Sequence, residues 1–374
     1  MNKLLTTALL MTLPAAGFAE STSDPRSFFS PDGKEVTEAY YPWAETARQM
    51  LNGQALAGGV NKFVHRPTLT PTDDQPVVRM NRDSYYSMAV VNVTEGATVT
   101  LPEVPEGKYL SMQPVTEDHR IQPMSYSGGT YELATHTGTH VYVILRYDAT
   151  FTPEEVKAYR DQTSIQAGND VMFSAEPVNK ASFDATEKAL KIKGQEITKA
   201  EGPLAAGIGR FTAPTDDTRS QYSPAKHQTA AAMGWGGAQM RDNIYEIVPD
   251  MPAEGCYQST FEDPKNHAFW SFTVYNKQGF MFDDVANVNS ELATPNADGT
   301  YTVSLGCGAD APNRIPISND SGVFNVTIRH YRPSDRVIEG IPAGAHNEES
   351  RVTASIPPRA SLSKSTGKHA PSAG

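Results

Sequence analysis

Two blocks of short β-strand patterns, with a helix-rich stretch between them, constrain how this chain can fold. In the first block, segments rich in β-branched and aromatic residues recur from residue 77 to residue 147, with Pro and Gly turns between them. The second block runs from 244 to 331. Several short strands at this spacing are typical of a β-sandwich or barrel. We therefore expect a mainly β fold with helical additions, in which two packed β-sandwich domains flank a helical middle segment.

Helix signals set the domain boundaries. At Thr152-Pro153-Glu154-Glu155, a threonine N-cap precedes a proline at the first helical position. An alanine-rich stretch at 224–233 predicts another helix before the second β block. The last residues carry almost no large apolar side chains, which predicts disorder. The expected organisation is an N-terminal β-sandwich domain at 37–150, a helical connector at 151–240, a C-terminal β-sandwich domain at 241–345 and a disordered tail at 346–374.

The first residues predict export. Lys3, the apolar run 4–16 and the small residues around Ala19 together form a signal peptide at 1–19. No other segment has 18 or more consecutive apolar residues, so we expect no integral membrane segment after signal removal and a periplasmic or secreted protein. An exported compartment permits a disulfide between the two cysteines, Cys256 and Cys307, although two separate buried thiols are the alternative.

Charge and missing motifs narrow the possible partners. The formal net charge is −11, and no basic patch with interleaved aromatics is present, so we expect no nucleic-acid partner. The chain has no nucleophile elbow, no phosphate-binding glycine loop and no His-Glu-x-x-His motif, and we expect neither a cofactor nor a metal. A small-molecule or glycan ligand is expected instead. A homo-oligomer is possible, and the sequence does not define the oligomeric state.

A dense polar cluster interrupts the first strand block at 81–87. Because alternate strand residues share a face, Arg82, Ser84 and Tyr86 would lie on one side of the strand. A guanidinium beside hydroxyls suits a carboxylate, a phosphate or a sugar hydroxyl. We take Asn81 as a further binding candidate and Asp83 as a catalytic one, together with Tyr86. The alternatives are an ion pair of Arg82 that holds the strand end, or a cluster that merely joins the two domains.

Three other positions are candidates. Asp118 and His119 follow a strand and combine a carboxylate with an imidazole that titrates near neutrality, which suits acid–base catalysis. The alternatives are a solvated charged turn, or a metal site completed by Asp83 and His140. Trp270 is either a core residue or a platform for a sugar. Arg329 lies on one strand face with Tyr331, either as an ion-pair partner or as a ligand contact.

At these motifs the chain resembles a known pair of bacterial domains. Residues 81–87, Asn-Arg-Asp-Ser-Tyr-Tyr-Ser, resemble the Asn-Arg-Asp-Thr-x-Tyr-Ser signature of the domain of unknown function numbered 1254. The strand at 269–275, the Asn-x-Asp-Gly turn at 296–299 and the strand at 324–333 resemble its usual C-terminal partner, numbered 1214. The resemblance implies two jelly-roll-like antiparallel β-sandwiches, often exported, without a settled activity. The signature residues that carry over are Asn81, Arg82, Asp83, Tyr86, Trp270, Asp298 and Arg329.

One departure from the family pattern adds a candidate. Where the family commonly has Asn-Trp-Leu-Pro, this chain has Asn313-Arg314-Ile315-Pro316. An arginine in place of the aromatic residue replaces a stacking contact with a possible anion contact, so Arg314 joins the binding candidates.

These observations lead to two functional hypotheses. The first is a hydrolase or lyase that acts on a small anionic or carbohydrate-like substrate in a cleft between the domains. Arg82 would orient the substrate, and Asp83 or Asp118 would act as acid or base, assisted by His119 and Tyr86. The alternative is a non-catalytic glycan- or protein-binding module of the cell envelope, because fold does not fix function.

Overall fold

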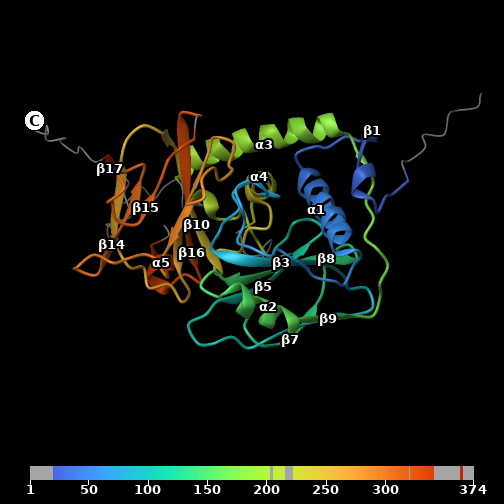
Figure 1. Cartoon of the computed structure of the whole chain (residues 1–374). Helices are drawn as coiled ribbons and strands as arrows, with labels where there is room; N and C mark the ends of the chain where they lie inside the picture. Colours follow the sequence, from blue (N-terminus) through green and yellow to red (C-terminus); the bar gives the residue numbers. More distant parts are fainter. Residues whose placement is uncertain (1–19, 203–204, 215–221, 320, 341–362, 365–374) are drawn as a thin grey trace, which may run out of the picture.

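The computed structural model describes residues 20–202, 205–214, 222–319, 321–340 and 363–364 (Figure 1). The predicted signal peptide at 1–19 lies outside the described residues, and so does the predicted disordered tail apart from residues 363–364. In the part of the chain that is described, no helix combines the length and the apolar character needed to cross a bilayer.

The N-terminal sandwich consists of a five-stranded and a three-stranded antiparallel sheet. In spatial order, the larger sheet contains β2 (Val64–His65), β3 (Ser84–Asn92), β8 (His140–Asp148), β5 (Leu110–Thr116) and β6 (Ser125–Tyr126). The smaller sheet contains β7 (Gly129–Leu133), β4 (Ala97–Leu101) and β9 (Ser164–Ala167). β8 is buried at every position because the smaller sheet covers one face and helices cover the other. This sandwich therefore includes β9, which follows the boundary expected at residue 150.

The C-terminal sandwich consists of two four-stranded sheets. One contains β10 (Asn243–Pro252), β16 (Val323–Tyr331), β12 (Trp270–Tyr275) and β13 (Asn287–Asn289). The other contains β15 (Arg314–Ile315), β14 (Thr300–Leu305), β11 (Tyr257–Glu262) and β17 (Ser363–Lys364). All strand pairs are antiparallel except the short β14–β15 pair. A disulfide joins Cys256 to Cys307 and confirms the predicted pairing.

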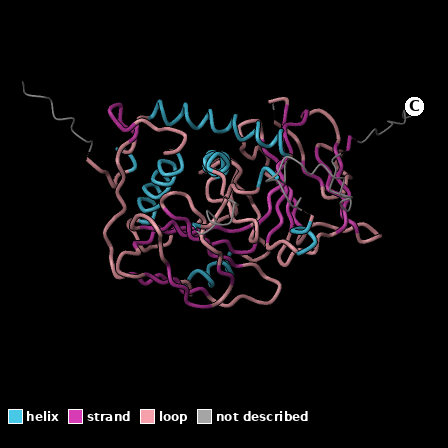
Figure 2. The backbone as a smooth tube through the Cα atoms, turned by 180° about the vertical axis from the view of Figure 1, so that it is seen from behind, coloured by secondary structure: helices cyan, strands magenta, loops and turns pink. Residues whose placement is uncertain are grey.

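Helices pack on the N-terminal sandwich and span the two domains (Figures 1 and 2). α1 (Tyr41–Ala57) and α4 (Pro224–Gly234) cover the larger sheet, and α3 (Lys180–Glu201) contacts both of these helices as well as β10 of the C-terminal sandwich. The remaining helices are short: α2 (Pro153–Asp161), α5 (Asp335–Glu339), η1 (Pro25–Ser27) and η2 (Ala205–Gly207), and β1 (Phe29–Lys34) precedes α1. α2 begins with the predicted capping box of Thr152 and Glu155.

The predicted fold class is confirmed: the protein is mainly β, with two jelly-roll-like sandwiches and a helical middle segment. One local prediction was wrong. Residues 77–80 are not a strand, because the Arg79 N–H donates to the Gly279 carbonyl of the other domain at 2.8 Å. An Asp-Gly pair is typical of hairpins, but β14, which follows Asp298-Gly299, pairs with β11 and β15 rather than with residues before the turn.

Candidate functional site

A cavity of about 610 Å³ lies between the two sandwiches. Its walls come from α1, the loop before β3, strands β3 and β8, the residues after α4, and strands β10 and β16 of the C-terminal domain. This volume lies within the range of small-molecule sites, and clefts between domains are common positions for such sites.

The charged side chains of the cavity wall are almost all cationic. Among the described residues, the lining contains a single carboxylate, that of Asp74, and no lysine, histidine or cysteine, although the whole chain carries a formal charge of −11. Guanidinium groups present planar forks that match carboxylates and phosphates. The six lining arginines are Arg48, Arg66, Arg79, Arg146, Arg210 and Arg329.

Two of these arginines are neutralised by a carboxylate. Arg66 forms an ion pair of 2.6 Å with Asp74, whose side chain is 67% exposed. Arg48 forms one of 2.6 Å with Glu45 on the same helix. For the other four, the described residues offer no carboxylate within 4.0 Å of the guanidinium.

Arg146 supplies the cationic group of the N-terminal domain. It lies in the buried strand β8 and is 6% exposed. Its guanidinium donates to the Gln113 side-chain oxygen at 2.7 Å and to the Gly236 carbonyl at 3.1 Å. Both acceptors are neutral, so they orient the guanidinium without cancelling its charge.

Arg79, Arg210 and Arg329 supply a second cationic group. Arg329 donates to the hydroxyls of Thr273 at 2.8 Å and Tyr275 at 2.7 Å, and to the Arg79 carbonyl at 2.8 Å. Burial lowers the pKa of Arg79, and the charge of Arg329 lowers it further. Burial together with the charge of Arg79 lowers the pKa of Arg210 to about 10. The positive charge of Arg79 therefore lies close enough to those of Arg329 and Arg210 to interact unfavourably with both.

The wall between the cationic groups is apolar and aromatic. Trp235, Gly236 and Gly237 follow α4 and form one side of it. Gly236 has a φ of +74°, in the left-handed region, and a Cβ on Gly237 would meet the Phe211 ring at 2.3 Å, so this turn requires glycines. The other apolar and aromatic lining residues include Val77, Met80, Met88, Tyr142, Ile144, Met233 and Tyr245.

Three of the predicted site residues line this cavity: Asn81, Tyr86 and Arg329. The Tyr86 hydroxyl accepts a hydrogen bond from the Asn81 amide at 2.8 Å. Arg82 and Ser84 are not part of the lining. β3 begins only at Ser84, so the strand alternation does not extend to Arg82, which instead donates to the Asp284 carbonyl at 2.7 Å. Ser84 is fully buried in the strand.

Asp83 lies outside the cavity lining, in a polar junction between the domains. It is fully buried and accepts hydrogen bonds from three side chains of the C-terminal sandwich. Ser271 and Tyr331 donate to Oδ2 at 2.6 and 3.1 Å, and Asn287 donates to Oδ1 at 2.7 Å. Burial raises the pKa of Asp83, and the charge of Arg329 together with these donors opposes that rise. Both oxygens are occupied, as expected for a residue that joins two domains.

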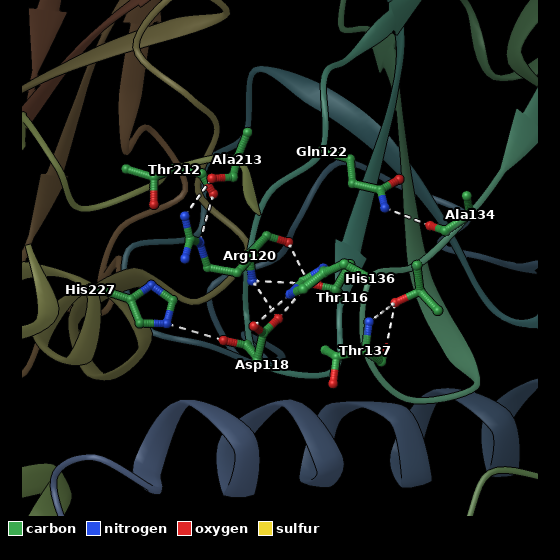
Figure 3. Close-up of polar contacts among 11 residues, drawn as sticks. Thr116, Asp118, Arg120, Gln122, Ala134, His136, Thr137, Thr212, Ala213 and His227 are labelled. Atoms are coloured by element: carbon green, nitrogen blue, oxygen red, sulfur yellow. Dashed lines mark hydrogen bonds and ion pairs between the residues drawn. The ribbon is translucent and has the colours of Figure 1, made fainter. Parts of the chain in front are cut away.

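The Asp118–His119 loop is not part of the cavity lining. The Asp118 carboxylate contacts His136 Nε2 at 2.9 Å and accepts from the Thr116 hydroxyl at 2.6 Å, and its backbone carbonyl accepts from His227 at 3.0 Å (Figure 3). His119 is fully buried and stacks on Trp235, with ring centroids 5.8 Å apart. Its Nε2 accepts from the Gly236 N–H at 3.0 Å, so the neutral ring carries its proton on Nδ1. Burial and the neighbouring His227 hold the pKa of His119 well below its ordinary value.

The remaining predicted residues, Trp270 and Arg314, do not line the cavity. Trp270 is 1% exposed in the core of the C-terminal sandwich, where it cannot stack on a ligand. Arg314 is exposed on β15 and donates to the Cys307 carbonyl at 2.9 Å. Within the described ranges, no group of three or more His, Cys, Asp or Glu side chains is arranged to hold a metal ion.

Sequence reasoning missed three of the four cavity arginines that have no carboxylate partner among the described residues. Arg146 carried a usable signal, because it is the one charged residue in the otherwise apolar and aromatic run 141–147. Arg79 and Arg210 lie in loops whose composition is unremarkable, and only the fold brings them beside Arg329.

Two family models match the chain. The model described as a protein of unknown function (DUF1254) matches residues 60–169, and the one described as a protein of unknown function (DUF1214) matches 251–335. The fold is similar to that of the VPA0106 protein from Vibrio parahaemolyticus, at 16% identity and a TM-score of 0.55, over 83% of this chain and 96% of that one. A putative uncharacterized protein from Burkholderia cenocepacia has 16% identity and a TM-score of 0.47, over 79% and 85%. A search of curated proteins found no match.

Proposed function

Because this chain belongs to the proteins that pair a DUF1254 domain with a DUF1214 domain, and both are families of unknown function, we propose its function from the cavity itself. The protein binds a small organic anion that has an apolar body, in the cavity between its two sandwiches. The observation that carries this proposal is the set of four lining arginines without a carboxylate partner among the described residues.

The energetics favour an anion at this position. Burying a charge is unfavourable unless it is paired and hydrogen-bonded. Two unit charges 4 Å apart interact by roughly 4 kcal/mol at an effective dielectric constant of 20. An anion that enters beside Arg146 recovers part of that energy, while its apolar body contacts Ile144, Met233 and Trp235. Arginine forks and an apolar wall together match a carboxylate on a hydrocarbon or aromatic frame better than a neutral glycan.

Binding without turnover fits the lining better than a hydrolase or lyase. General acid–base catalysis needs a group that titrates near the working pH. The one carboxylate that described residues contribute to the lining, that of Asp74, is exposed and paired with Arg66. The proposed acid–base candidates Asp83, Asp118 and His119 all lie outside the lining. Of the predicted catalytic residues, Tyr86 alone faces the cavity.

A thermal-shift screen of the full chain tests this proposal. The ligands are aliphatic and aromatic carboxylates and matched neutral amides, and the variants are Arg146→Met and its control Arg314→Met, which removes the same charge at an exposed position. A ligand at a hundredfold excess over Kd stabilises the native state by about 2.7 kcal/mol. We expect anions, not amides, to stabilise the wild type and Arg314→Met but not Arg146→Met. Equal shifts in both variants would place binding elsewhere, and consumption of the ligand during incubation would restore the enzyme hypothesis.

We also propose that the protein acts in the periplasm or outside the cell. The sequence pattern at 1–19 supports export, and the Cys256–Cys307 disulfide is compatible with an oxidising compartment. N-terminal sequencing of protein from the periplasmic or secreted fraction should begin at Glu20. An intact Met1 in that fraction would contradict the proposal.

A further inference from the structure

We infer that the ligand is a dianion of the dicarboxylate class, with one acid group held by Arg146 and the other by Arg210 together with Arg79 and Arg329. This inference rests on the proposed function and names the class of ligand for the same cavity. It depends on where the four arginines without an ion-pair partner come from. Arg146 extends from the N-terminal sandwich, whereas Arg329 of the C-terminal sandwich donates to the Arg79 carbonyl, and the charge of Arg79 acts on Arg210.

The first group is built to hold a carboxylate on the N-terminal side. Arg146 extends from β8, and its two hydrogen bonds run to Gln113 on β5 and to Gly236 after α4. Tyr86, which pairs with Arg146 across β3 and β8, also faces the cavity, and the guanidinium carbon lies 5.7 Å from its ring centroid. A carboxylate here would meet a guanidinium whose position is fixed before the ligand arrives.

The second group contains a buried guanidinium with an unsatisfied donor. Arg210 is 3% exposed, and its Nη2 donates to the Gly194 carbonyl at 3.2 Å and to the Thr198 hydroxyl at 3.0 Å. Its Nε is buried and has no acceptor among the described residues, which is unfavourable. Arg210 also lines the cavity, so an acid group of the ligand would lie beside a guanidinium that no described carboxylate contacts.

The arginines beside Arg210 strengthen the requirement for negative charge. Arg79 donates to neutral oxygens of Asn325 at 3.0 Å and Thr327 at 3.1 Å, and its own carbonyl accepts from Arg329. Asp83, Asp250 and Glu201 act on this group only through space, because none of them is within ion-pair distance of it. A monoanion bound at Arg146 would leave this second group without a negative charge at ion-pair distance.

Tyr245 links the two groups along the cavity wall. Its phenol lies close enough to both Arg146 and Arg329 to respond to the charge of each. The Tyr245 hydroxyl accepts from the Ala238 N–H at 2.8 Å, so the ring is fixed in place. An apolar spacer that runs past Tyr245 and Ile144 would therefore carry one acid group to each cationic group, and the ligand would contact both domains.

Calorimetric titration with matched ligands tests the inference on the full chain. The probes are a series of α,ω-dicarboxylates and the monocarboxylates with the same number of carbons. We expect the best dicarboxylate to bind at least about tenfold more tightly than its monocarboxylate, because a hydrogen bond to a charged group typically contributes this much. Arg210→Met should remove that advantage, so that the dicarboxylate and its monocarboxylate bind about equally, whereas Arg146→Met should weaken both ligands.

The outcomes separate this inference from the proposed function. If mono- and dicarboxylates of every length bind equally, the second acid group has no partner and the dianion inference is wrong, while anion binding stands. If neither class binds, the proposed function fails and the inference with it. If Arg210→Met does not fold, the wild-type affinities for monocarboxylates and dicarboxylates still test the inference. Arg210→Lys then serves as a second variant, which should keep the charge and part of the dicarboxylate preference.

Discussion

Two polar clusters lie at the same domain boundary and differ in how their charges are satisfied. At the junction, the Asp83 carboxylate accepts three hydrogen bonds from the opposite domain, and both of its oxygens are used. In the cavity, four arginines donate to neutral groups, and the buried Nε of Arg210 has no acceptor among the described residues. The first cluster is complete without a ligand, and the second becomes complete only with one. Residues that look equally functional in the sequence therefore have different roles.

The largest expected effect belongs to the junction. Asp83→Ala should lower the free energy of unfolding by about 3–5 kcal/mol, because it leaves buried donors without an acceptor and Arg329 without a nearby negative charge. Urea unfolding measures this change, and Asp310→Ala at an exposed position is the control, with no measurable effect expected. If Asp83→Ala folds as stably as the wild type but loses ligand binding, Asp83 belongs to the binding site.

In the cavity, we expect a substitution to raise the free energy of unfolding rather than to lower it. Arg210→Met should raise the stability of the ligand-free protein by about 1 kcal/mol, because it removes a buried charge that no described carboxylate neutralises. The same unfolding experiment measures it. A loss of several kcal/mol would show that Arg210 is a structural residue that holds α3, and would remove the contrast between the two clusters.

The pH dependence distinguishes His119 from Asp83. The folded state favours neutral His119, so its contribution to stability is fully present above pH 6.5 and is lost as the pH falls below that value, by up to about 1.4 kcal/mol per pH unit. Asp83 has a raised pKa, so its contribution changes in the opposite direction and decreases as the pH rises above the ordinary Asp range. Stability between pH 4 and 8 should therefore fall less steeply in acid for His119→Gln than for the wild type.

A protonated His119 cannot accept the Gly236 N–H, and Gly236 also holds Arg146 through its carbonyl. Anion affinity of the wild type should therefore decrease in the same acidic range. If anion affinity decreases equally with falling pH in the wild type and in His119→Gln, a group other than His119 controls that decrease.

The smallest effect is expected for Arg82. Arg82→Ala removes one hydrogen bond to the Asp284 carbonyl and should change the free energy of unfolding by about 0.5–1.5 kcal/mol. Because Arg82 does not line the cavity, anion affinity should stay within twofold, or about 0.4 kcal/mol, of the wild type. A tenfold loss of affinity in calorimetry would restore Arg82 as the residue that orients the ligand.

The sequence predicted elements whose signals are local. β4, β16 and the cap of α2 appear where alternation and capping residues indicate them, and the disulfide was expected from the compartment and cysteine count. The segment 77–80 has strand-like residues, but cross-domain hydrogen bonds hold its backbone as a loop. That loop shortens β3 and removes Arg82 from the face of Tyr86.

The cavity could be predicted only in part. Asn81, Tyr86 and Arg329 were selected because polar residues are unusual in such strands. Arg48, Arg79, Arg146 and Arg210 come from separate elements, and their convergence depends on how two domains pack. No local pattern encodes that geometry. Asp118 and His119 were selected as catalytic candidates because carboxylates and imidazoles can exchange protons. In the structure, the Asp118 carbonyl accepts from His227, and His119 accepts from the N–H of Gly236 in the cavity wall.

The most direct test of the central claim is a crystal structure of the protein with a bromine-labelled carboxylate selected by its thermal shift. The account predicts an anomalous bromine peak inside the cavity between the sandwiches, with the carboxylate oxygens within hydrogen-bond distance of Arg146. A ligand bound on the surface, or at the Asp83 junction with the cavity left to water, would contradict it.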